Sequence, residues 1–303
     1  MSVRPSARRS DVVSEEEMAH PGTVETPLTE RSSRVSAARK LTRRAGRERA
    51  GMFLAEGAMA VTEALDALSG QHPPGGAPTE VREVFATHEG LRRHPEVADR
   101  CSAAGVALRI VTERAAATLS ETVTPQGLVA VCGLPRPSLD GVLAARPELV
   151  AVLSDVADPG NAGTVVRVAD AAGAGAVLFA GDTVDPYNGK AVRASTGSVF
   201  HLPLIRERDV SSVFAACRDA GMKLIGADGE AAEDLHTAET RGRLDGPTAW
   251  VFGSEAHGLG ERSAELDHAL RVPVYGRAES LNLATAAAVC LYTSARRVHR
   301  PEA

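Results

Sequence analysis

Three short polar segments of the sequence carry the side chains that could do chemistry. The first contains Asn161 and Arg167, the second contains Glu255, and the third contains Ser280 and Asn282. Asn161 and Arg167 are six residues apart, so a helix would place them nearly two turns apart on the same side. Because a guanidinium keeps its proton, Arg167 is better suited to holding a phosphate or stabilising a developing oxyanion than to acting as a general base.

Each of these side chains also has an ordinary structural alternative. Ser280 and Asn282 belong to the residue types that cap helix N-termini, because their side-chain oxygens accept unpaired backbone N–H groups. Arg167 could be a surface arginine paired with a carboxylate, and Glu255 could be a carboxylate favoured at a helix start by the helix dipole. The chemical interpretation therefore depends on what surrounds the three segments.

All three segments have the same surroundings, an apolar strand before a glycine-containing turn and a helix-forming run after it. Strands are predicted at 149–154, 176–180, 199–205, 222–227, 248–252 and 270–274. Helices are predicted at 161–173, 188–195, 209–220, 258–267 and 281–297. This alternation favours a mostly parallel sheet covered on both faces, in an α/β domain that spans residues 149–303.

Residues 31–132 are predicted to form a separate, small α/β sandwich. A helix is expected from 32 to about 50, followed by strands at 53–57, 81–87, 107–111 and 127–132 and helices at 58–68, 95–104 and 113–119. Residues 1–30 lack apolar periodicity and are predicted to be a disordered tail, and 71–78 a Pro/Gly-rich loop. The proline-containing stretch 133–148 is the expected linker between the two domains.

The composition excludes several classes of protein. Hydrophobic residues at 44% and charged residues at 24% are typical of globular proteins, and no apolar run approaches membrane-spanning length. The N-terminus lacks the apolar region of a signal peptide, so a cytoplasmic protein without membrane contact is expected. The four cysteines are far apart and the nine histidines form no H-x-x-x-H, which predicts neither a disulfide framework nor a metal site.

The distribution of charge is more informative than the net charge of −5. Residues 31–49 hold eight Lys and Arg against one acid, and such a basic helix suits a phosphate backbone. Arg193 is a further candidate for a phosphate contact, although a structural ion pair explains it equally well. The candidate RNA contacts are therefore Arg34, Arg39, Lys40, Arg43, Arg44 and Arg193.

The three segments together resemble, in order, the three motifs of the SpoU/TrmH family. They read N-x-G-x-x-x-R from Asn161, F-G-S-E-x-x-G-L from Phe252 and P-x-x-x-x-x-E-S-L-N from Pro273. Each motif alone is weak, whereas three in order over about half of the chain are specific. Members of this family are S-adenosylmethionine-dependent RNA ribose 2′-O-methyltransferases of the SPOUT class. The resemblance implies a deep C-terminal trefoil knot, through which the last helix passes, and a homodimer formed by the knotted domains.

The resemblance also implies roles for individual residues. The implied catalytic residues are Asn161, Arg167, Glu255, Ser280 and Asn282. The implied S-adenosylmethionine-binding residues are Gly253, Gly258, Val272, Leu281 and Asn282.

The N-terminal sandwich is similar to the ribosomal-protein-like RNA-binding domain that precedes many of these enzymes. This similarity favours ribosomal RNA, with 23S as the expected substrate. Methylation of transfer RNA, an antibiotic-resistance methylation of ribosomal RNA, and a non-catalytic RNA-binding or ribosome-assembly protein remain open alternatives.

Overall fold

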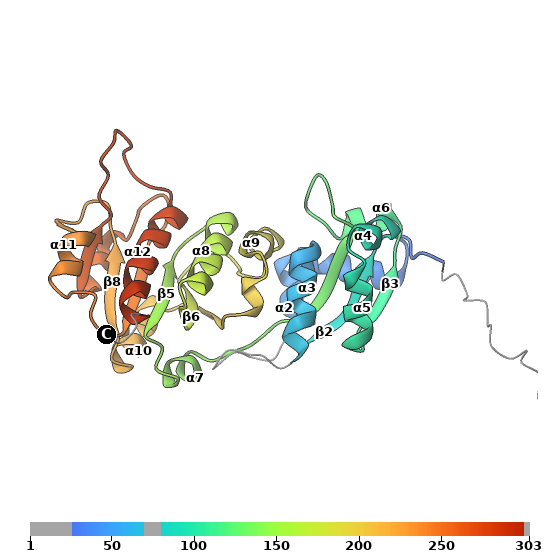
Figure 1. Cartoon of the computed structure of the whole chain (residues 1–303), viewed down its shortest axis with the longest axis horizontal. Coiled ribbons are helices and arrows are strands. Elements are labelled where there is room, and N and C mark those ends of the chain that lie inside the picture. The colour runs from blue at the N-terminus through green and yellow to red at the C-terminus, as the bar shows by residue number, and fades with distance from the viewer. Residues whose placement is uncertain (1–25, 70–79, 300–303) are drawn as a thin grey trace, which may run out of the picture.

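Two β-sheets organise the computed structural model, which describes residues 26–69 and 80–299. They lie one after the other along the long axis of the molecule (Figure 1). The predictions for residues 1–25 and for the loop at 71–78 lie outside the described residues. The backbone N–H of Leu28 donates to the carbonyl of Ile110 at 2.8 Å, so ordered structure begins before the predicted end of the tail at residue 30.

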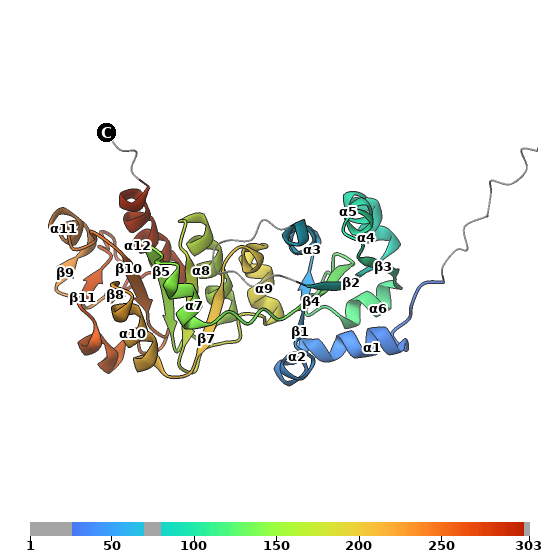
Figure 2. The same cartoon turned by 90° about the horizontal axis from the view of Figure 1, so that it is seen from below.

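The N-terminal sheet is mixed, with four strands in the order β1 (Met52–Glu56), β4 (Leu128–Gly133), β2 (Val81–Ala86), β3 (Ala107–Ile110). β4 pairs antiparallel with β1 and β2, whereas β2 and β3 are parallel. Side chains alternate between two apolar cores, with Phe53 and Ala55 in one and Met52 and Leu54 in the other. The first core is covered by α3 (Ala58–Asp66) and α5 (Glu96–Ala103), the second by α1 (Ser33–Arg39) and α6 (Glu113–Thr118) (Figure 2). The predicted α/β class of this region is confirmed.

The basic segment is not the single helix predicted at 32–50. It forms α1, the short 3₁₀ helix η1 (Lys40–Thr42) and α2 (Arg44–Ala50), with Arg43 extended between them at φ −102° and ψ 139°. The Arg47 side chain is buried, and its Nη1 donates to the carbonyls of Leu41 at 2.9 Å and Thr42 at 3.0 Å. It thereby pairs acceptors that a continuous helix would have paired with backbone N–H groups.

The C-terminal sheet has seven parallel strands, in the order β7 (Leu204–Glu207), β6 (Ala176–Ala180), β5 (Leu149–Ser154), β10 (Thr248–Phe252), β8 (Lys223–Ala227), β11 (His268–Arg271), β9 (Glu233–Asp234). β5, β6 and β10 are buried along their whole length. One face packs against α8 (Pro159–Ala171), α9 (Gly189–Ser195), α11 (Leu235–Thr240) and α12 (Leu283–Val298). The other face packs against α7 (Leu139–Ala144) and α10 (Val210–Asp219). The predicted parallel sheet with two covered faces is confirmed.

Three short helices were not predicted, namely α4 (His88–Arg93), α7 and α11. Each has only six residues, too few for a helical apolar period to show. Their signal in the sequence is the capping residue before each, Thr87, Ser138 or Asp234, whose side chain accepts a backbone N–H group. The predicted linker at 133–148 therefore contains a helix.

Three other predictions are wrong in type or position. The strand predicted at 199–205 begins only at Leu204, because Ser198–Phe200 is a 3₁₀ helix, η3, whose Phe200 packs on Phe53 with ring centroids 5.9 Å apart. The helix predicted at 258–267 is the 3₁₀ helix η4 (Gly260–Glu265). The strand predicted at 270–274 is β11 (His268–Arg271), which begins two residues before the predicted start.

Within residues 26–69 and 80–299, no helix is both long enough and apolar enough to cross a bilayer. The same residues contain no group of three or more His, Cys, Asp or Glu arranged to hold a metal ion. The four cysteines are free and buried. Burial raises the pKa of the Cys217 thiol to about 12, so this side chain behaves as a small apolar core residue.

Candidate functional site

The three polar segments of the sequence meet at one edge of the C-terminal sheet. They follow β5, β10 and β11, which are parallel, so all three begin at the carboxyl ends of their strands. The last of them is the long loop before α12, drawn in red, which projects beyond the sheet (Figure 1). Open parallel sheets bind ligands at this edge, so the fold places the candidate residues where a site is expected.

The first segment is held in place by a capped helix start. Asp158 is the N-cap of α8, and its Oδ1 accepts the backbone N–H of Asn161 at 2.8 Å. Pro159 follows at the first helical position, where its missing N–H costs nothing. The cap therefore fixes where the Asn161 side chain leaves the helix.

A chain of side-chain hydrogen bonds joins the three segments. The amide Nδ2 of Asn161 donates to Oε1 of Glu255 at 2.9 Å. The Oδ1 of Asn161 accepts from Nδ2 of Asn282 at 3.0 Å. Residues 94 and 121 positions away from Asn161 are thus brought within hydrogen-bond distance of it.

Glu255 is held as an ionised carboxylate. Besides the Asn161 amide, it accepts the backbone N–H groups of Ala157 and Asp158, each at 3.3 Å. Desolvation by burial acts to raise the pKa of Glu255, but these hydrogen bonds outweigh it and lower the pKa below its ordinary value. Glu255 is therefore a weak proton acceptor, and its geometry suits it to fixing Asn161 and the loop before α8.

Asn282 has both of the roles that its position suggested. It is the N-cap of α12, and its Oδ1 accepts the backbone N–H groups of Ala284 at 2.9 Å and Thr285 at 3.3 Å. Its amide group is left free to donate to Asn161. The capping interpretation and the site interpretation are therefore compatible for this residue.

A cavity of about 690 Å³ opens between the second and third segments, a size typical of small-molecule sites. Its lining comes from the loops that follow β8, β10 and β11 and from the start of α12. All five residues predicted to bind the cofactor line it, as do the predicted catalytic residues Glu255, Ser280 and Asn282. The five are Gly253, Gly258, Val272, Leu281 and Asn282.

Glycine is required in the turn that forms one wall of this cavity. A Cβ at Gly253 would lie 2.1 Å from the carbonyl oxygen of Gly258, which is backbone and cannot turn away. Gly258 itself has φ +57°, a conformation that glycine adopts readily. The segment between them therefore folds back on itself and keeps the wall close to the cavity.

One wall of the cavity was missed by the sequence predictions. It is the turn after β8, which contributes Ala227, Asp228, Gly229 and Glu230. β8 is parallel to β10 and β11 and ends at the same edge. The position of this strand in the predicted parallel sheet could have indicated that the turn after it belongs to the site.

The charges around the cavity are of one sign. Four carboxylates line it, from Asp228, Glu230, Glu255 and Glu279, and no Lys or Arg of the described chain does. Such a lining attracts a cationic ligand and disfavours a cofactor that carries several phosphates.

Arg167 does not line this cavity. It is exposed on α8, and its Nη1 donates to Oγ1 of Thr196 at 3.2 Å. Its partner is therefore a hydroxyl and not the carboxylate of the structural alternative. Of the first segment's two polar residues, only Asn161 reaches the other segments in this chain.

The basic residues of the N-terminal region divide into exposed and structural ones. Arg39, Lys40 and Arg43 are exposed. Arg34 and Arg44 are also largely accessible, with 55% and 40% of their side chains exposed, but each pairs with a carboxylate, Arg34 with Glu83 at 3.3 Å and Arg44 with Glu48 at 2.8 Å. Four of the five lie on α1, η1 and α2, and Arg43 lies between η1 and α2; these elements are on one side of the sheet (Figure 2).

Arg193 is placed differently from this basic group. Its Nη1 is 2.7 Å from the buried carboxylate of Glu56, with only 25% of its own side chain exposed. The structural ion pair is thus the alternative observed for Arg193.

Comparison with known proteins gives matches over both sheets. Residues 148–292 match the SpoU rRNA Methylase family, and residues 32–130 match the MRM3-like substrate binding domain. The Bacillus subtilis protein described as 23S rRNA (guanosine(2553)-2′-O)-methyltransferase RlmP is 33% identical over 266 residues, which cover 86% of this chain and 96% of that protein.

Solved structures match over nearly the whole chain. The AdoMet-bound rRNA methyltransferase from Sinorhizobium meliloti superposes with a TM-score of 0.73 at 30% identity, covering 89% of this chain and 96% of that one. The SpoU methyltransferase AviRb from Streptomyces viridochromogenes, in complex with AdoMet, has a TM-score of 0.72 at 29% identity and covers 90% and 100%.

Proposed function

The chain belongs to the SpoU rRNA methylase family, and we propose that it transfers the methyl group of S-adenosylmethionine to a ribose 2′-hydroxyl of 23S ribosomal RNA. The observation that carries this proposal is the acidic cavity bordered by the hydrogen-bonded chain Glu255–Asn161–Asn282. The 23S substrate follows the relative from Bacillus subtilis, which is named for that RNA.

The cavity fits S-adenosylmethionine in size, charge and apolar character. The cofactor bears a sulfonium and an ammonium group against one carboxylate, and the carboxylates lining the cavity suit that net positive charge. Val272, Leu281 and the backbone at Gly253 and Gly258 would hold the adenosine and methionine parts. When bound, this cofactor supplies an electrophilic methyl carbon, and the protein supplies position and electrostatics.

The residues of the site would act mainly by placing the ribose. Asn161, Glu255, Ser280 and Asn282 would hold the sugar so that the 2′-oxygen lies in line with the methyl carbon and sulfur, a contribution of several kcal/mol through proximity. Arg167 would bind the adjacent phosphate and stabilise negative charge that develops on the 2′-oxygen. This role requires no loss of the guanidinium proton.

The proposed enzyme is a homodimer in which each site uses both subunits. Arg167 does not line the cavity of its own chain and contacts Thr196 instead. Pairing of two C-terminal domains through α8 and α12 would bring the arginine of one subunit to the cavity of the other. The exposed Tyr292 on α12, 48% accessible in the single chain, would be covered in that interface.

We also propose that the C-terminal domain contains a trefoil knot. β10 lies between β5 and β8, although both precede it in the sequence, and α12 then packs against β5, β8 and β10. The last helix would pass through the loop that this insertion creates, which would explain why the segment before α12 is part of the cavity wall.

We also propose different roles for the two domains. Residues 31–132 would bind RNA through Arg34, Arg39, Lys40, Arg43 and Arg44, residues 133–148 would connect the domains, and 149–303 would carry out methyl transfer. The two family matches, at 32–130 and 148–292, support these boundaries. A ribosomal RNA substrate places the proposed activity in the cytoplasm.

The experiment that tests the proposal measures transfer of a labelled methyl group from S-adenosylmethionine to purified 23S, 16S and transfer RNA. Incorporation into 23S RNA, lost in Arg167→Ala, is expected. Incorporation into transfer RNA alone would mean that transfer RNA, and not 23S RNA, is the substrate. Failure to bind S-adenosylmethionine in calorimetry would refute the proposed methyltransferase activity. The alternative of a non-catalytic RNA-binding protein would then remain.

A further inference from the structure

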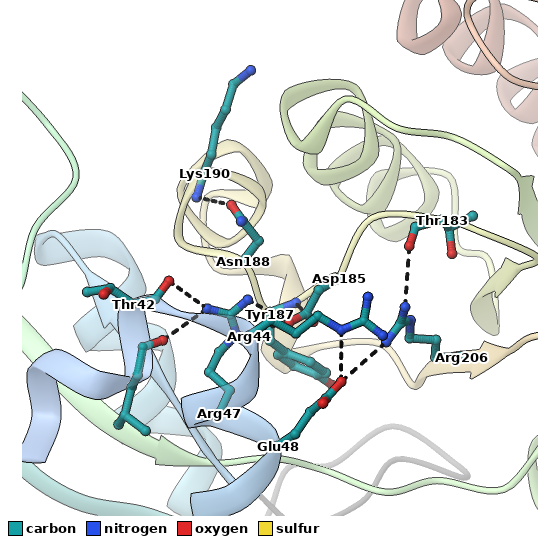
Figure 3. A network of polar contacts seen from close by, with 11 residues as sticks. Thr42, Arg44, Arg47, Glu48, Thr183, Asp185, Tyr187, Asn188, Lys190 and Arg206 are labelled. Carbon is teal, nitrogen blue, oxygen red and sulfur yellow. Dashed lines mark hydrogen bonds and ion pairs between the residues drawn. The ribbon is translucent and has the colours of Figure 1, made fainter.

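The segment 182–197, which ends in α9, contacts both halves of the molecule. Nε and Nη2 of Arg47 donate to Oδ2 of Asp185 at 2.9 and 2.7 Å, and only 3% and 14% of the two side chains are exposed (Figure 3). The Nη1 group of Arg47 donates to the carbonyls of Leu41 and Thr42. The arginine is therefore held from both directions, and two charge-assisted hydrogen bonds to the same carboxylate oxygen limit its orientation as well as its distance.

Further contacts join the same segment to the N-terminal sheet. The Arg193–Glu56 ion pair lies next to Thr122, whose hydroxyl donates to the same carboxylate at 3.0 Å. The rings of Tyr187 and Phe53 have centroids 4.7 Å apart. The segment 182–197 is thus attached to the proposed RNA-binding domain by two ion pairs and one aromatic contact, of which the Arg193–Glu56 pair comes from α9 itself.

Glu48 and Arg206 add an outer contact across the same boundary. Glu48 lies on α2 between Arg44 at 2.8 Å and Arg206 of β7 at 3.8 Å (Figure 3). The Glu48 side chain is 59% exposed, so this contact is weaker than the buried pair beneath it.

On its other side α9 packs directly against α8. A Cβ at Gly163 would lie 2.2 Å from the carbonyl oxygen of Ala191 and 2.8 Å from the Cβ of Ala194. Only glycine allows this approach, and Gly163 is the glycine of the N-x-G-x-x-x-R motif. The motif therefore encodes the contact with α9 as well as two polar side chains.

Two polar contacts then connect α9 to the residues of the site. The Nζ of Lys190 lies 2.8 Å from Oδ2 of Asp158, the residue whose other oxygen caps α8 at Asn161. At the opposite end of α9, Oγ1 of Thr196 accepts from Arg167 at 3.2 Å. Both polar residues of the first motif are thus reached from the same short helix.

The backbone of Thr196 is an outlier that this contact explains. Its φ of 53° and ψ of 42° are left-handed, a conformation that β-branched residues rarely adopt. Glycine would adopt it without strain but lacks a hydroxyl. Strained residues persist where their side chain has a function, and the one polar contact of this side chain on the described chain is with Arg167.

We propose that α9 fixes the catalytic helix α8 relative to the RNA-binding domain, with Lys190 and Thr196 as positioning residues for Asn161 and Arg167. This inference rests on the proposed methyl transfer. RNA bound by α1 and α2 would then meet Arg167 at a distance set by the chain Arg47–Asp185–α9–α8. In the proposed dimer, the cavity that this arginine serves belongs to the partner subunit.

The first test compares Thr196→Gly with Thr196→Ser. Thr196→Gly should raise the melting temperature because it relieves the left-handed conformation, yet lower kcat for RNA methylation by about tenfold through loss of the hydroxyl. Thr196→Ser keeps the hydroxyl and should retain kcat within about twofold. Both variants should bind S-adenosylmethionine like the wild type. A Thr196→Gly protein with wild-type kcat would overturn the positioning role.

The second test addresses the link to the RNA-binding domain. Asp185→Asn removes the negative charge of the buried pair and replaces one acceptor oxygen with an NH2 donor, and Asp182→Asn, at an exposed acid three residues earlier, is the matched control. Asp185→Asn should lower kcat by at least about fivefold at saturating cofactor, with cofactor affinity unchanged, whereas Asp182→Asn should have no effect. A lower melting temperature with unchanged kcat would mean that the pair is only structural.

Arg167→Ala, measured in parallel, distinguishes a failure of the proposed methyl transfer from a failure of the positioning by α9. Full activity of Arg167→Ala would refute the proposed role of that arginine in methyl transfer. An inactive Arg167→Ala beside a fully active Thr196→Gly would refute only the positioning by α9.

Discussion

At the scale of single residues, the site depends on one amide. Asn161 donates to Glu255 and accepts from Asn282 at the same time, which a carboxylate, an alcohol of shorter reach or an ammonium group could not do in this geometry. Because Glu255 also holds the backbone before α8, the three segments form one connected unit. Loss of the amide should therefore disturb all of them.

Replacing this amide should lower the rate of methyl transfer more than it lowers stability. We expect Asn161→Ala to reduce kcat by about 10- to 100-fold, equivalent to about 1.4–2.8 kcal/mol of transition-state stabilisation. The control is Thr164→Ala, on the same helix, whose hydroxyl bonds only to the carbonyl of Gly160. Equal kcat values for the two variants in a steady-state assay would contradict the proposed role of Asn161.

The glycine turn of the cavity gives a prediction about cofactor affinity. A Cβ at Gly253 meets backbone at 2.1 Å, so Gly253→Ala must displace the turn, whereas a Cβ at Gly276 has no atom within 4 Å. Calorimetric titration should show S-adenosylmethionine bound at least about tenfold more weakly by Gly253→Ala, and nearly unchanged by Gly276→Ala. Similar affinities for both variants would place the cofactor elsewhere.

Residue types and spacing predicted seven residues of the cavity lining, because the motifs follow strands that end at one sheet edge. They could not predict that Arg167 turns toward Thr196, since that depends on how α9 packs on Gly163. Nor could they separate Arg193 from a phosphate contact, because its partner Glu56 lies 137 positions away. Distant pairs of this kind are set by the tertiary structure.

At the scale of elements, β5, β6 and β10 were predicted because they are continuous apolar runs buried on both faces, whereas the two-residue β9, Glu233–Asp234, was not predicted. The basic segment was mispredicted as one helix because the break at Arg43 carries no proline or glycine and is stabilised by side-chain hydrogen bonds of Arg47, which residue type alone does not indicate. η4 replaces an α-helix over a stretch in which all six residues are at least partly exposed. Without an apolar face, such a segment has little to hold a longer helix in place.

His201 forms a pH-sensitive contact between α3 and α8. Its Nδ1 is 2.8 Å from Asp170 and its Nε2 is 3.0 Å from Glu63. Desolvation by burial lowers the pKa of His201, but hydrogen bonds and charges from the two carboxylates outweigh it and raise the pKa above its ordinary value. Its stabilising effect is therefore full below the unfolded-state pKa of about 6.5 and is lost as pH rises through the folded-state pKa.

Substitution of His201 should thus matter more in mild acid than in base. We expect His201→Gln to lower the free energy of unfolding by up to about 1 kcal/mol at about pH 6, since the side chain is partly exposed, and by less at about pH 9. Denaturant unfolding at the two pH values measures the difference, with the exposed His236→Gln as control. A loss of unfolding free energy in His201→Gln that is larger at about pH 9 than at about pH 6 would contradict the raised pKa of His201.

At the scale of the whole molecule, the proposed dimer explains why the cavity and Arg167 are separated within one chain. A dimer with sites shared between subunits predicts complementation. Arg167→Ala and Asn282→Ala proteins should each be inactive, because every site in either dimer lacks one residue.

Co-expression of these two variants should restore about a quarter of wild-type activity, since half of the dimers would be mixed and one of their two sites intact. Differently tagged copies would establish that mixed dimers form. Recovery far below this value, with mixed dimers present, would mean that each chain supplies a complete site.

The most direct test of the central claim is the chemical position of the transferred methyl group. Purified 23S RNA would be incubated with the enzyme and isotopically labelled S-adenosylmethionine, digested to nucleosides and analysed by mass spectrometry. The proposed in-line transfer to a ribose oxygen predicts a nucleoside that carries the label on its sugar, releases an unmodified base and resists alkaline cleavage at its 3′ side. Label found on a base would contradict the assignment of the site as a 2′-O-methyltransferase.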